Sequence, residues 1–457
     1  MSTQTKTLRI GALLMVLALV AGACGPATSP TAAPATQAAA PTAAPTLAPE
    51  PVELTVWARF PEIEAFLKKI GEKYTAEHPN VTVTVTLFAQ RALDEKLAIA
   101  LPSGEAADLF ELDDYGVYGY HKQGLLESLP PDLAEYVRAH VVDAVVTSAA
   151  DENGAIFTAP LYYYEQTLFI NQDQFAEVGL QGCPKTMEEL VDFAKKLTKY
   201  DANGKVSRSG LLLRLAGGAY GISEKFWALA MIPNGVAPFE KVGSGWRAGY
   251  DNEGGQAALQ FYLDALYKDK IDSPDIMHDA EGFGLGAGSI FHRESWVVGY
   301  LAQNTPDIKY ETCLMPKGPK GWGTVFTAGS LSVPAATKNK DVAFDFIKFT
   351  LSDENQVLLI DDTGWQPVRK DVDFSSVYAK YPTYETFLTA FNTVGYDPQP
   401  YPQLVATNEI LGKLAEGLQL AWNNPDLADD PAGVAEAIHR MAEETNRILD
   451  SYGELAK

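Results

Sequence analysis

The chain has 457 residues, of which 46% are hydrophobic and 21% are charged, a composition typical of a globular protein long enough to bury two cores. Its formal net charge of -23 argues against nucleic acid or an anionic membrane surface as the main partner, because both require a basic patch. We therefore expect no nucleic-acid partner, and the charge alone leaves the chemistry of any small ligand open.

The first 23 residues have the layout of a secretory leader. Lys6 and Arg9 precede an apolar run at residues 10–20, which is shorter than a typical transmembrane helix. The run is followed by AGAC, which ends at Cys24 and resembles a bacterial lipobox, although its first alanine stands where leucine is commonest. The resemblance implies that Cys24 is lipidated and becomes the mature N-terminus. An ordinary signal peptide cut nearby is the alternative.

Residues 24–51 are rich in Pro, Ala and Thr, carry almost no charge and contain Leu47 as their one large apolar residue. Such a segment cannot bury a core, and its composition is that of a tether. We predict that it holds a globular body away from a membrane surface.

The folded region is predicted to begin at Val52 with strands and helices in alternation. Strands are expected at 52–58, 81–87 and 108–110, separated by helices that begin at Pro61 and Arg91. This βαβαβ order predicts a parallel sheet whose strand ends form a crevice for a ligand.

The stretch 160–198 is the most informative part of the chain. Three consecutive tyrosines at 162–164 precede an apolar run at 168–170 that predicts a buried strand. Thr186 then has the character of a helix N-cap, with Glu189 three residues later as its capping-box partner.

Apolar patterns predict further elements along the rest of the chain. A short strand is expected at 211–215, helices at 226–230 and 254–267, and a longer strand at 326–334. Residues 381–457 are expected to be mostly helical.

Four motifs, in this order, resemble those of the sugar-type extracellular solute-binding proteins that serve bacterial ABC importers, the family typified by maltose-binding protein. They are NQDQFAEVGL at 171–180, PKTMEEL at 184–190, MPKGP at 315–319 and GWQPVR at 364–369. The resemblance covers nearly everything from Val52 onward. It implies an α/β fold of two lobes joined by a hinge, of the type II-like periplasmic-binding-protein class.

The same resemblance implies how the chain is divided and what it does. The first lobe is expected to comprise 52–160 and 315–363, and the second lobe 161–314 and 364–457. A solute, most simply a mono- or oligosaccharide, would bind in the interlobe cleft and close the hinge. The loaded protein, a monomer anchored outside the cytoplasm by the lipid on Cys24, would then dock on the ABC permease. No cofactor and no catalytic activity are implied.

A sugar has apolar CH faces and a rim of hydroxyls, so its site needs aromatic surfaces and polar side chains that hydrogen-bond in pairs. For each aromatic residue, packing in the hydrophobic core is the competing interpretation. The predicted ligand-binding residues are Trp57, Arg59, Asp113, Asp114, Tyr163, Tyr164, Glu165, Trp227, Trp296 and Trp365.

Other functions remain open on the sequence alone. Within the binding class, the solute could instead be a polyol, a glycerol phosphodiester, a peptide or a cation. A glycosidase would need a carboxylate pair, which Glu111, Asp113 and Glu165 could supply. Carboxylates are so common that this match carries little information, and the third class, a lipid-anchored adhesin, would need no cleft aromatics at all.

Histidine and cysteine give no sign of a metal site, because the six histidines show no ligand spacing with each other or with cysteine. Cys183 and Cys313 either form a disulfide or remain as two buried thiols, since the sequence does not supply the distance that a disulfide requires.

Overall fold

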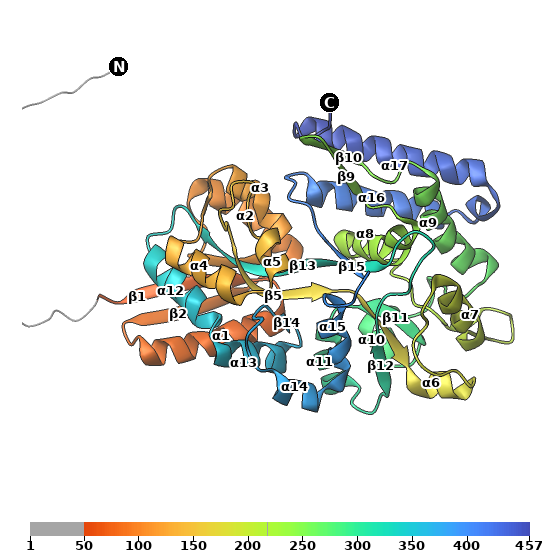
Figure 1. Ribbon diagram of the computed structural model, residues 1–457, viewed down its shortest axis with the longest axis horizontal. Coiled ribbons are helices and arrows are strands. Elements are labelled where there is room, and N and C mark those ends of the chain that lie inside the picture. Colours follow the sequence, from red (N-terminus) through yellow and green to blue (C-terminus); the bar gives the residue numbers. More distant parts are fainter. Residues whose placement is uncertain (1–49, 217) are drawn as a thin grey trace, which may run out of the picture. The chain divides into compact units, whose positions relative to one another are not determined.

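The computed structural model of the protein describes residues 50–457 except Gly217, so the predicted leader, Cys24 and most of the tether lie outside the described residues. Two α/β lobes make up the described part, and β5 (Ala159–Glu165) and β13 (Gly323–Pro334) run from one toward the other (Figure 1). Within this part of the chain, no helix is both long enough and apolar enough to cross a membrane.

The first lobe is built on one mixed sheet with the strand order β14-β5-β13-β3-β1-β2, to which β4 and β15 add by pairing with β13. Its strands are β1 (Val52–Ala58), β2 (Val81–Leu87), β3 (Leu109–Asp113), β4 (Leu126–Glu127), β5, β13, β14 (Gln366–Pro367) and β15 (Asp397–Pro400). Its helices are α1 (Pro61–Glu77), α2 (Gln90–Ser103), α3 (Asp114–Lys122), α4 (Pro131–His140), α5 (Asp143–Ser148), α12 (Lys340–Thr350) and α13 (Asp353–Thr363).

The βαβαβ prediction is confirmed, because β1 pairs in parallel with both β2 and β3. Strand β1 buries every second side chain, and α1 begins at Pro61 and turns its apolar face onto the sheet. Strand β2 lies at the edge of the sheet, which is why Leu87 stays 39% exposed although it continues the apolar alternation.

The second lobe contains a three-stranded antiparallel sheet, β11-β6-β12, surrounded by helices. Its strands are β6 (Thr167–Asn171), β7 (Lys199–Tyr200), β8 (Val206–Arg208), β9 (Phe239–Val242), β10 (Gly245–Ala248), β11 (Ile290–Arg293) and β12 (Tyr310–Cys313). Its helices are α6 (Gln172–Glu177), α7 (Met187–Leu197), α8 (Ala219–Phe226), α9 (Glu253–Leu263), α10 (Asp279–Gly284), α11 (Trp296–Asn304), α14 (Ser375–Lys380), α15 (Glu385–Ala390), α16 (Thr407–Trp422) and α17 (Pro431–Ser451).

Most of the predicted second-lobe elements are confirmed, but the strand at 211–215 is wrong. The four leucines of this segment are buried and Arg214 is half-buried, yet the only ladder contact is an isolated bridge between Leu212 and Phe291. The helix predicted at 226–230 exists but begins earlier, as α8, and continues as a π-helical segment at Trp227–Met231. A short run of mostly apolar residues fits a buried strand and a buried loop equally well, which is why the strand prediction failed.

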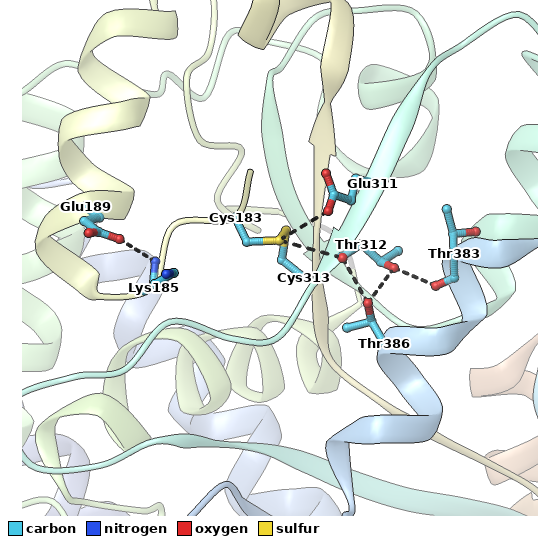
Figure 2. The surroundings of a disulfide bond; sticks show 8 residues. All are labelled: Cys183, Lys185, Glu189, Glu311, Thr312, Cys313, Thr383 and Thr386. Atoms are coloured by element: carbon cyan, nitrogen blue, oxygen red, sulfur yellow. Dashed lines mark hydrogen bonds between the residues drawn. A yellow bond between two sulfur atoms is a disulfide. The ribbon is translucent and has the colours of Figure 1, made fainter. Parts of the chain in front are cut away.

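The entry to α7 is fixed in two ways. Cys183 and Cys313 form a disulfide, which decides between the two alternatives left open by the sequence (Figure 2). The predicted cap is also present, because Thr186 Oγ1 accepts a hydrogen bond of 3.2 Å from the Glu189 backbone N–H. In a capping box, the Glu189 carboxylate would accept from the backbone N–H of Thr186. It accepts instead from the backbone N–H of the preceding residue, Lys185, at 2.7 Å.

The hinge region is compact. Only Gln166 separates β5 in the first sheet from β6 in the second. Strand β14 pairs with β5, and Trp365 packs in the first core, close to the boundary predicted between 363 and 364.

Candidate binding site

A cavity of about 440 Å³ lies between the two lobes. Its first-lobe wall is formed by residues at the carboxyl ends of β1, β3 and β5 and at the end of α13, and its second-lobe wall comes mainly from α8 and α11. The carboxyl edge of a parallel sheet is the usual position for a ligand in α/β folds, and the volume is within the range of small-molecule sites.

The first-lobe wall is organised around the buried guanidinium of Arg59. Its Nη1 donates to Asp113 Oδ2 at 2.5 Å, its Nη2 donates to Asp113 Oδ1, and its Nε donates to Glu111 Oε1 at 3.0 Å. Tyr162 and Tyr164 donate from their hydroxyls to Glu111 and Asp113, at 2.6 and 2.8 Å. Arg59 is thus a bidentate partner of Asp113, a geometry that fixes both side chains.

Burial and the neighbouring charges shift the pKa values of this network in opposite directions. Burial raises the pKa of Glu111, and the adjacent Arg59 charge and the Tyr162 hydroxyl act in the opposite direction. Burial likewise opposes the charge of Arg59, but Asp113 and Glu111 hold its pKa above the ordinary value.

Space for this network comes from Gly329 on β13. A Cβ atom at Gly329 would lie 2.0 Å from Cζ of Tyr162, so no larger residue fits while the tyrosine ring holds its position. The ring reaches Glu111 across this glycine, at the point where the β5–β13 register shifts.

Aromatic side chains line the cavity from both lobes. Trp365 stacks on Phe60 with ring centroids 5.7 Å apart, contacts Tyr164 at 5.1 Å and faces Trp296 of the second lobe at 6.4 Å. Trp296 is half-buried, and its indole Nε1 donates to Glu294 Oε2 at 2.9 Å. These rings provide the apolar platforms expected of a sugar site.

The second-lobe wall carries a buried charge cluster. Lys225 Nζ donates to Glu294 Oε1 and, at 3.2 Å, to Glu224 Oε1, and Gln166 Nε2 donates to Glu294 Oε1 at 2.8 Å. Burial alone would raise the pKa of Glu294, but Arg293 and Lys225 hold it well below its ordinary value, so this carboxylate stays ionised.

Five of the ten predicted residues line the cavity: Arg59, Asp113, Tyr164, Trp296 and Trp365. They come from both lobes and from segments distant in the sequence, as a cleft requires.

The other five lie outside the cavity lining. Trp57 packs edge-on against Phe88, 5.4 Å between ring centroids, and lies under the ammonium group of Lys96. Trp227 is buried in the second core and donates from Nε1 to Gln399 Oε1 at 3.1 Å. Both tryptophans therefore have the packing role that competed with ligand binding.

The remaining three are buried polar or aromatic residues beside the site. Asp114 begins α3 and accepts from Thr327 Oγ1 at 2.6 Å and from its neighbour's backbone N–H at 2.7 Å. Burial raises the pKa of Asp114 to about 6. Tyr163 and Glu165 alternate with Tyr164 along β5, so they point to the opposite face of the sheet, and Tyr163 packs there against Phe391.

Sequence reasoning missed the residues that α8 contributes, above all Glu224 and Lys225, as well as Arg214 just before it. A signal was present, because the charged pair Glu224-Lys225 stands directly before the apolar run 226–231. Charged residues are almost never fully buried unless they are paired, so a charged pair at such a position indicates a site or a structural ion pair.

Residues 50–216 and 218–457 contain no group of three His, Cys, Asp or Glu side chains placed to hold a metal ion. Ion pairs form within each wall of the cavity, between Arg59 and Asp113 on the first and between Lys225 and Glu294 on the second.

Solved structures with the same fold include an ABC transporter solute-binding protein of Thermotoga lettingae bound to α-D-tagatose, with a TM-score of 0.71 at 22% identity over 87% of this chain and 99% of that one. Maltose-bound MalE3 of T. maritima gives a TM-score of 0.73 at 19% identity over 86% and 99%. The predicted fold class, two α/β lobes of the periplasmic-binding-protein type, is confirmed.

In sequence, the chain is 34% identical over 164 residues to the lactose-binding protein of Rhizobium radiobacter, which covers 30% of this chain. It spans 38% of the length of that relative. The pattern that defines the bacterial extracellular solute-binding proteins matches residues 69–386, well over half of the chain. The protein therefore belongs to the family of bacterial extracellular solute-binding proteins.

Proposed function

We propose that the protein captures a carbohydrate in the interlobe cavity and delivers it to an ABC-type importer. The observation that carries this proposal is the combination of aromatic surface from Trp296 and Trp365 with the fixed carboxylate of Asp113 in one cavity. Sugar CH faces pack on aromatic rings, and sugar hydroxyls donate to carboxylates. The tagatose, maltose and lactose bound by the relatives support the same class of solute.

Binding is expected to close the hinge between the lobes. A solute that contacts both walls gains more interactions in the closed state than in the open one, so it shifts the population toward closure. Trp296 and Trp365 come from opposite lobes and would then enclose the sugar between them.

A melting scan of the mature chain against sugars, polyols, amino acids, glycerol phosphodiesters, short peptides and polyamines tests the solute class. A ligand at about a hundred times its dissociation constant adds about 2.7 kcal/mol to the free energy of unfolding. We expect a saccharide to raise the melting temperature. A response to a peptide or polyamine alone would contradict the carbohydrate assignment, and a complete lack of response would favour an adhesin.

Trp296→Ala tests the cavity itself. We expect calorimetry to show an affinity loss of at least about tenfold, since truncating an aromatic anchor commonly costs more than 1 kcal/mol of binding. The matched control is Trp246→Ala, a half-buried tryptophan on β10 outside the cavity. If both variants bind alike and melt at equally reduced temperatures, Trp296 acts only in packing.

We further propose that a lipid on Cys24 anchors the protein, as a monomer, outside the cytoplasmic membrane beside its permease. The leader and the AGAC motif support this proposal, and the Pro/Ala/Thr-rich tether supplies the reach. Labelled fatty acid should be incorporated into the full chain and not into Cys24→Ser, which should be released from the membrane fraction. Retention of label by Cys24→Ser would exclude this site of attachment.

A further inference from the structure

Gln166 is the one residue that separates β5 of the first sheet from β6 of the second, and it is fully buried. A single hydroxyl of β13 holds its backbone on both sides. Gln166 N donates to Thr324 Oγ1 at 3.0 Å, and Thr324 Oγ1 donates to Gln166 O at 2.9 Å. A change in the angle between two lobes is absorbed by the backbone of connecting residues such as this one. Gln166 therefore lies where the chain must adjust when the hinge moves.

The side chain of Gln166 reaches the charge cluster on the second wall of the cavity. Its Nε2 donates to Glu224 Oε1 and, at 2.8 Å, to Glu294 Oε1. The ammonium group of Lys225 donates to the same two oxygens. Two donors thus bridge two carboxylates, and one of these donors belongs to the hinge. The reverse orientation of the amide would set its oxygen against both carboxylates, so the direction of these bonds is fixed.

The amide oxygen of Gln166 is left unsatisfied by this arrangement. Oε1 is inaccessible to solvent and has no hydrogen-bond partner among residues 50–216 and 218–457. A buried acceptor without a partner lowers stability, and the bonds that Nε2 donates to two carboxylates offset this loss. Within the described part of the chain, the amide is therefore held only by Glu224 and Glu294.

Glu294 connects this cluster to the aromatic surface of the cavity. Its Oε1 accepts from Gln166 and Lys225, and its Oε2 accepts from the indole Nε1 of Trp296 at 2.9 Å. Arg293, whose Nη1 lies 3.2 Å from Glu294 Oε2, packs over the Trp296 ring with its Cζ 5.1 Å from the ring centroid. Glu294 therefore holds both the edge of the indole and the cation that lies over it.

The charge of Glu294 strengthens each of these bonds. Burial alone would raise its pKa, but Arg293 and Lys225 hold the pKa well below its ordinary value. An ionised carboxylate only accepts hydrogen bonds, and the loss of one donor leaves part of a buried charge unpaired. Removal of the Gln166 amide should therefore shift the Glu294 carboxylate toward its remaining donors and displace the indole that it holds.

We propose that Gln166 is a positioning residue that couples the solute site to the hinge: its amide holds Glu294, and Glu294 orients Trp296 for the solute. The inference rests on the proposed carbohydrate function and adds the route by which contact with the second wall reaches the connection between the lobes. A solute that fixes Trp296 also favours the hinge angle at which the amide of Gln166 can reach Glu294. Because such coupling is reciprocal, a hinge angle that displaces Gln166 lowers the affinity of the wall for the solute.

The test measures the saccharide affinity of the mature chain by calorimetry. The probe is the saccharide that most raises the melting temperature of the wild type, from a panel that includes glucose, maltose and lactose. Gln166→Met keeps the length of the side chain and removes both donors, and we expect it to bind about tenfold or more weakly than the wild type. The matched control is Gln356→Met, which should bind within about twofold of the wild type. Gln356 is equally buried but bonds only to backbone groups, those of Leu161, Thr350 and Val368.

A double-mutant cycle separates positioning from a general loss of stability. Trp296→Phe keeps an aromatic ring but removes the indole donor to Glu294. If Gln166 acts on the ring through Glu294, the double variant Gln166→Met/Trp296→Phe should bind about as weakly as the weaker single variant. Losses that multiply would mean that the two residues act independently, and the proposed route would be wrong.

A variant whose donor can be switched on by pH gives a second readout. Gln166→Glu introduces a carboxyl that donates only when it is protonated. Burial and the carboxylates of Glu224 and Glu294 raise the pKa of this group, and the ammonium group of Lys225 opposes them. The affinity of Gln166→Glu, relative to the wild type at the same pH, should recover as the pH falls from about 8 to about 5, and that of Gln166→Met should not. A flat ratio for Gln166→Glu would contradict the donor role.

Small-angle scattering at a saturating concentration of the same saccharide follows the hinge directly. The wild type and Gln356→Met should become more compact, and Gln166→Met should do so less. If Gln166→Met binds and compacts as the wild type does, the coupling role is wrong and the carbohydrate function stands. If no saccharide binds to the wild type, both fall. Should Gln166→Met fail to fold, Trp296→Phe decides alone, because unchanged affinity would show that the bond to Glu294 does not position the ring.

Discussion

The disulfide between Cys183 and Cys313 should stabilise the second lobe strongly without affecting solute binding. The two residues are 130 positions apart, and both belong to the second lobe: Cys183 precedes α7, and Cys313 ends β12 (Figure 2). Cross-linking removes loop-closure entropy from the unfolded chain, and for a loop of this length the chain-entropy relation gives about 5 kcal/mol. Measured losses usually fall below this limit, so we expect about 2–4 kcal/mol.

The assay is urea unfolding of the wild type and of the double variant Cys183→Ser/Cys313→Ser, followed by tryptophan fluorescence. Reduced wild type is the matched control, since it loses the bond without losing the sulfur atoms. Affinity for the solute should stay within about twofold of the wild-type value. The disulfide does not span the hinge, so its loss should not change the populations of the open and closed states. A stability loss below about 1 kcal/mol would refute the loop-entropy argument for this lobe.

Three smaller predictions concern single residues. Burial raises the pKa of Glu165 well above its ordinary value, so the free energy of unfolding of the wild type should fall as the pH rises above about 4.5. Urea unfolding of Glu165→Gln should show that this loss is absent. If the wild type and the variant lose stability in parallel, the prediction is wrong. Gly329→Ala should cost about 1–3 kcal/mol, measured by thermal unfolding, because its Cβ collides with Tyr162, and an unchanged melting temperature would mean that the ring moves aside freely. Thr186→Ala should cost about 1 kcal/mol by removing the α7 cap, whereas Thr186→Ser should cost little.

The strands of the first lobe could be predicted because alternation and helix signals agree there. Val52 to Phe110 contains each strand and helix in the order that the structure confirms. The run at 211–215 was wrongly predicted as a strand, because its mostly apolar pattern carries no period and a single bridge to Phe291 replaces a ladder.

The sequence predicted which strand contributes to the site but not which face of that strand lines the cavity. Tyr162, Tyr163 and Tyr164 are adjacent, and a strand sends alternate side chains to opposite sides. The sequence places all three at the crossing, yet Tyr164 lines the cavity, whereas Tyr163 and Glu165 pack behind it. Which face meets the second lobe depends on contacts made hundreds of residues away, such as Phe391 on Tyr163.

The charged side chains on both walls of the cavity are held by partners within their own wall. On the first wall, Arg59 forms ion pairs with Asp113 and Glu111. The carboxylate oxygens on that wall are therefore fixed in position and were desolvated when the protein folded. Preorganised acceptors of this kind favour hydroxyl donors and disfavour anions. On the second wall, the cations are paired: Lys225 and Arg293 share Glu294, and Arg293 and Arg214 share Asp279. A sugar would therefore donate its hydroxyls to the carboxylate of Asp113, while Trp296 and Trp365 pack on its CH faces.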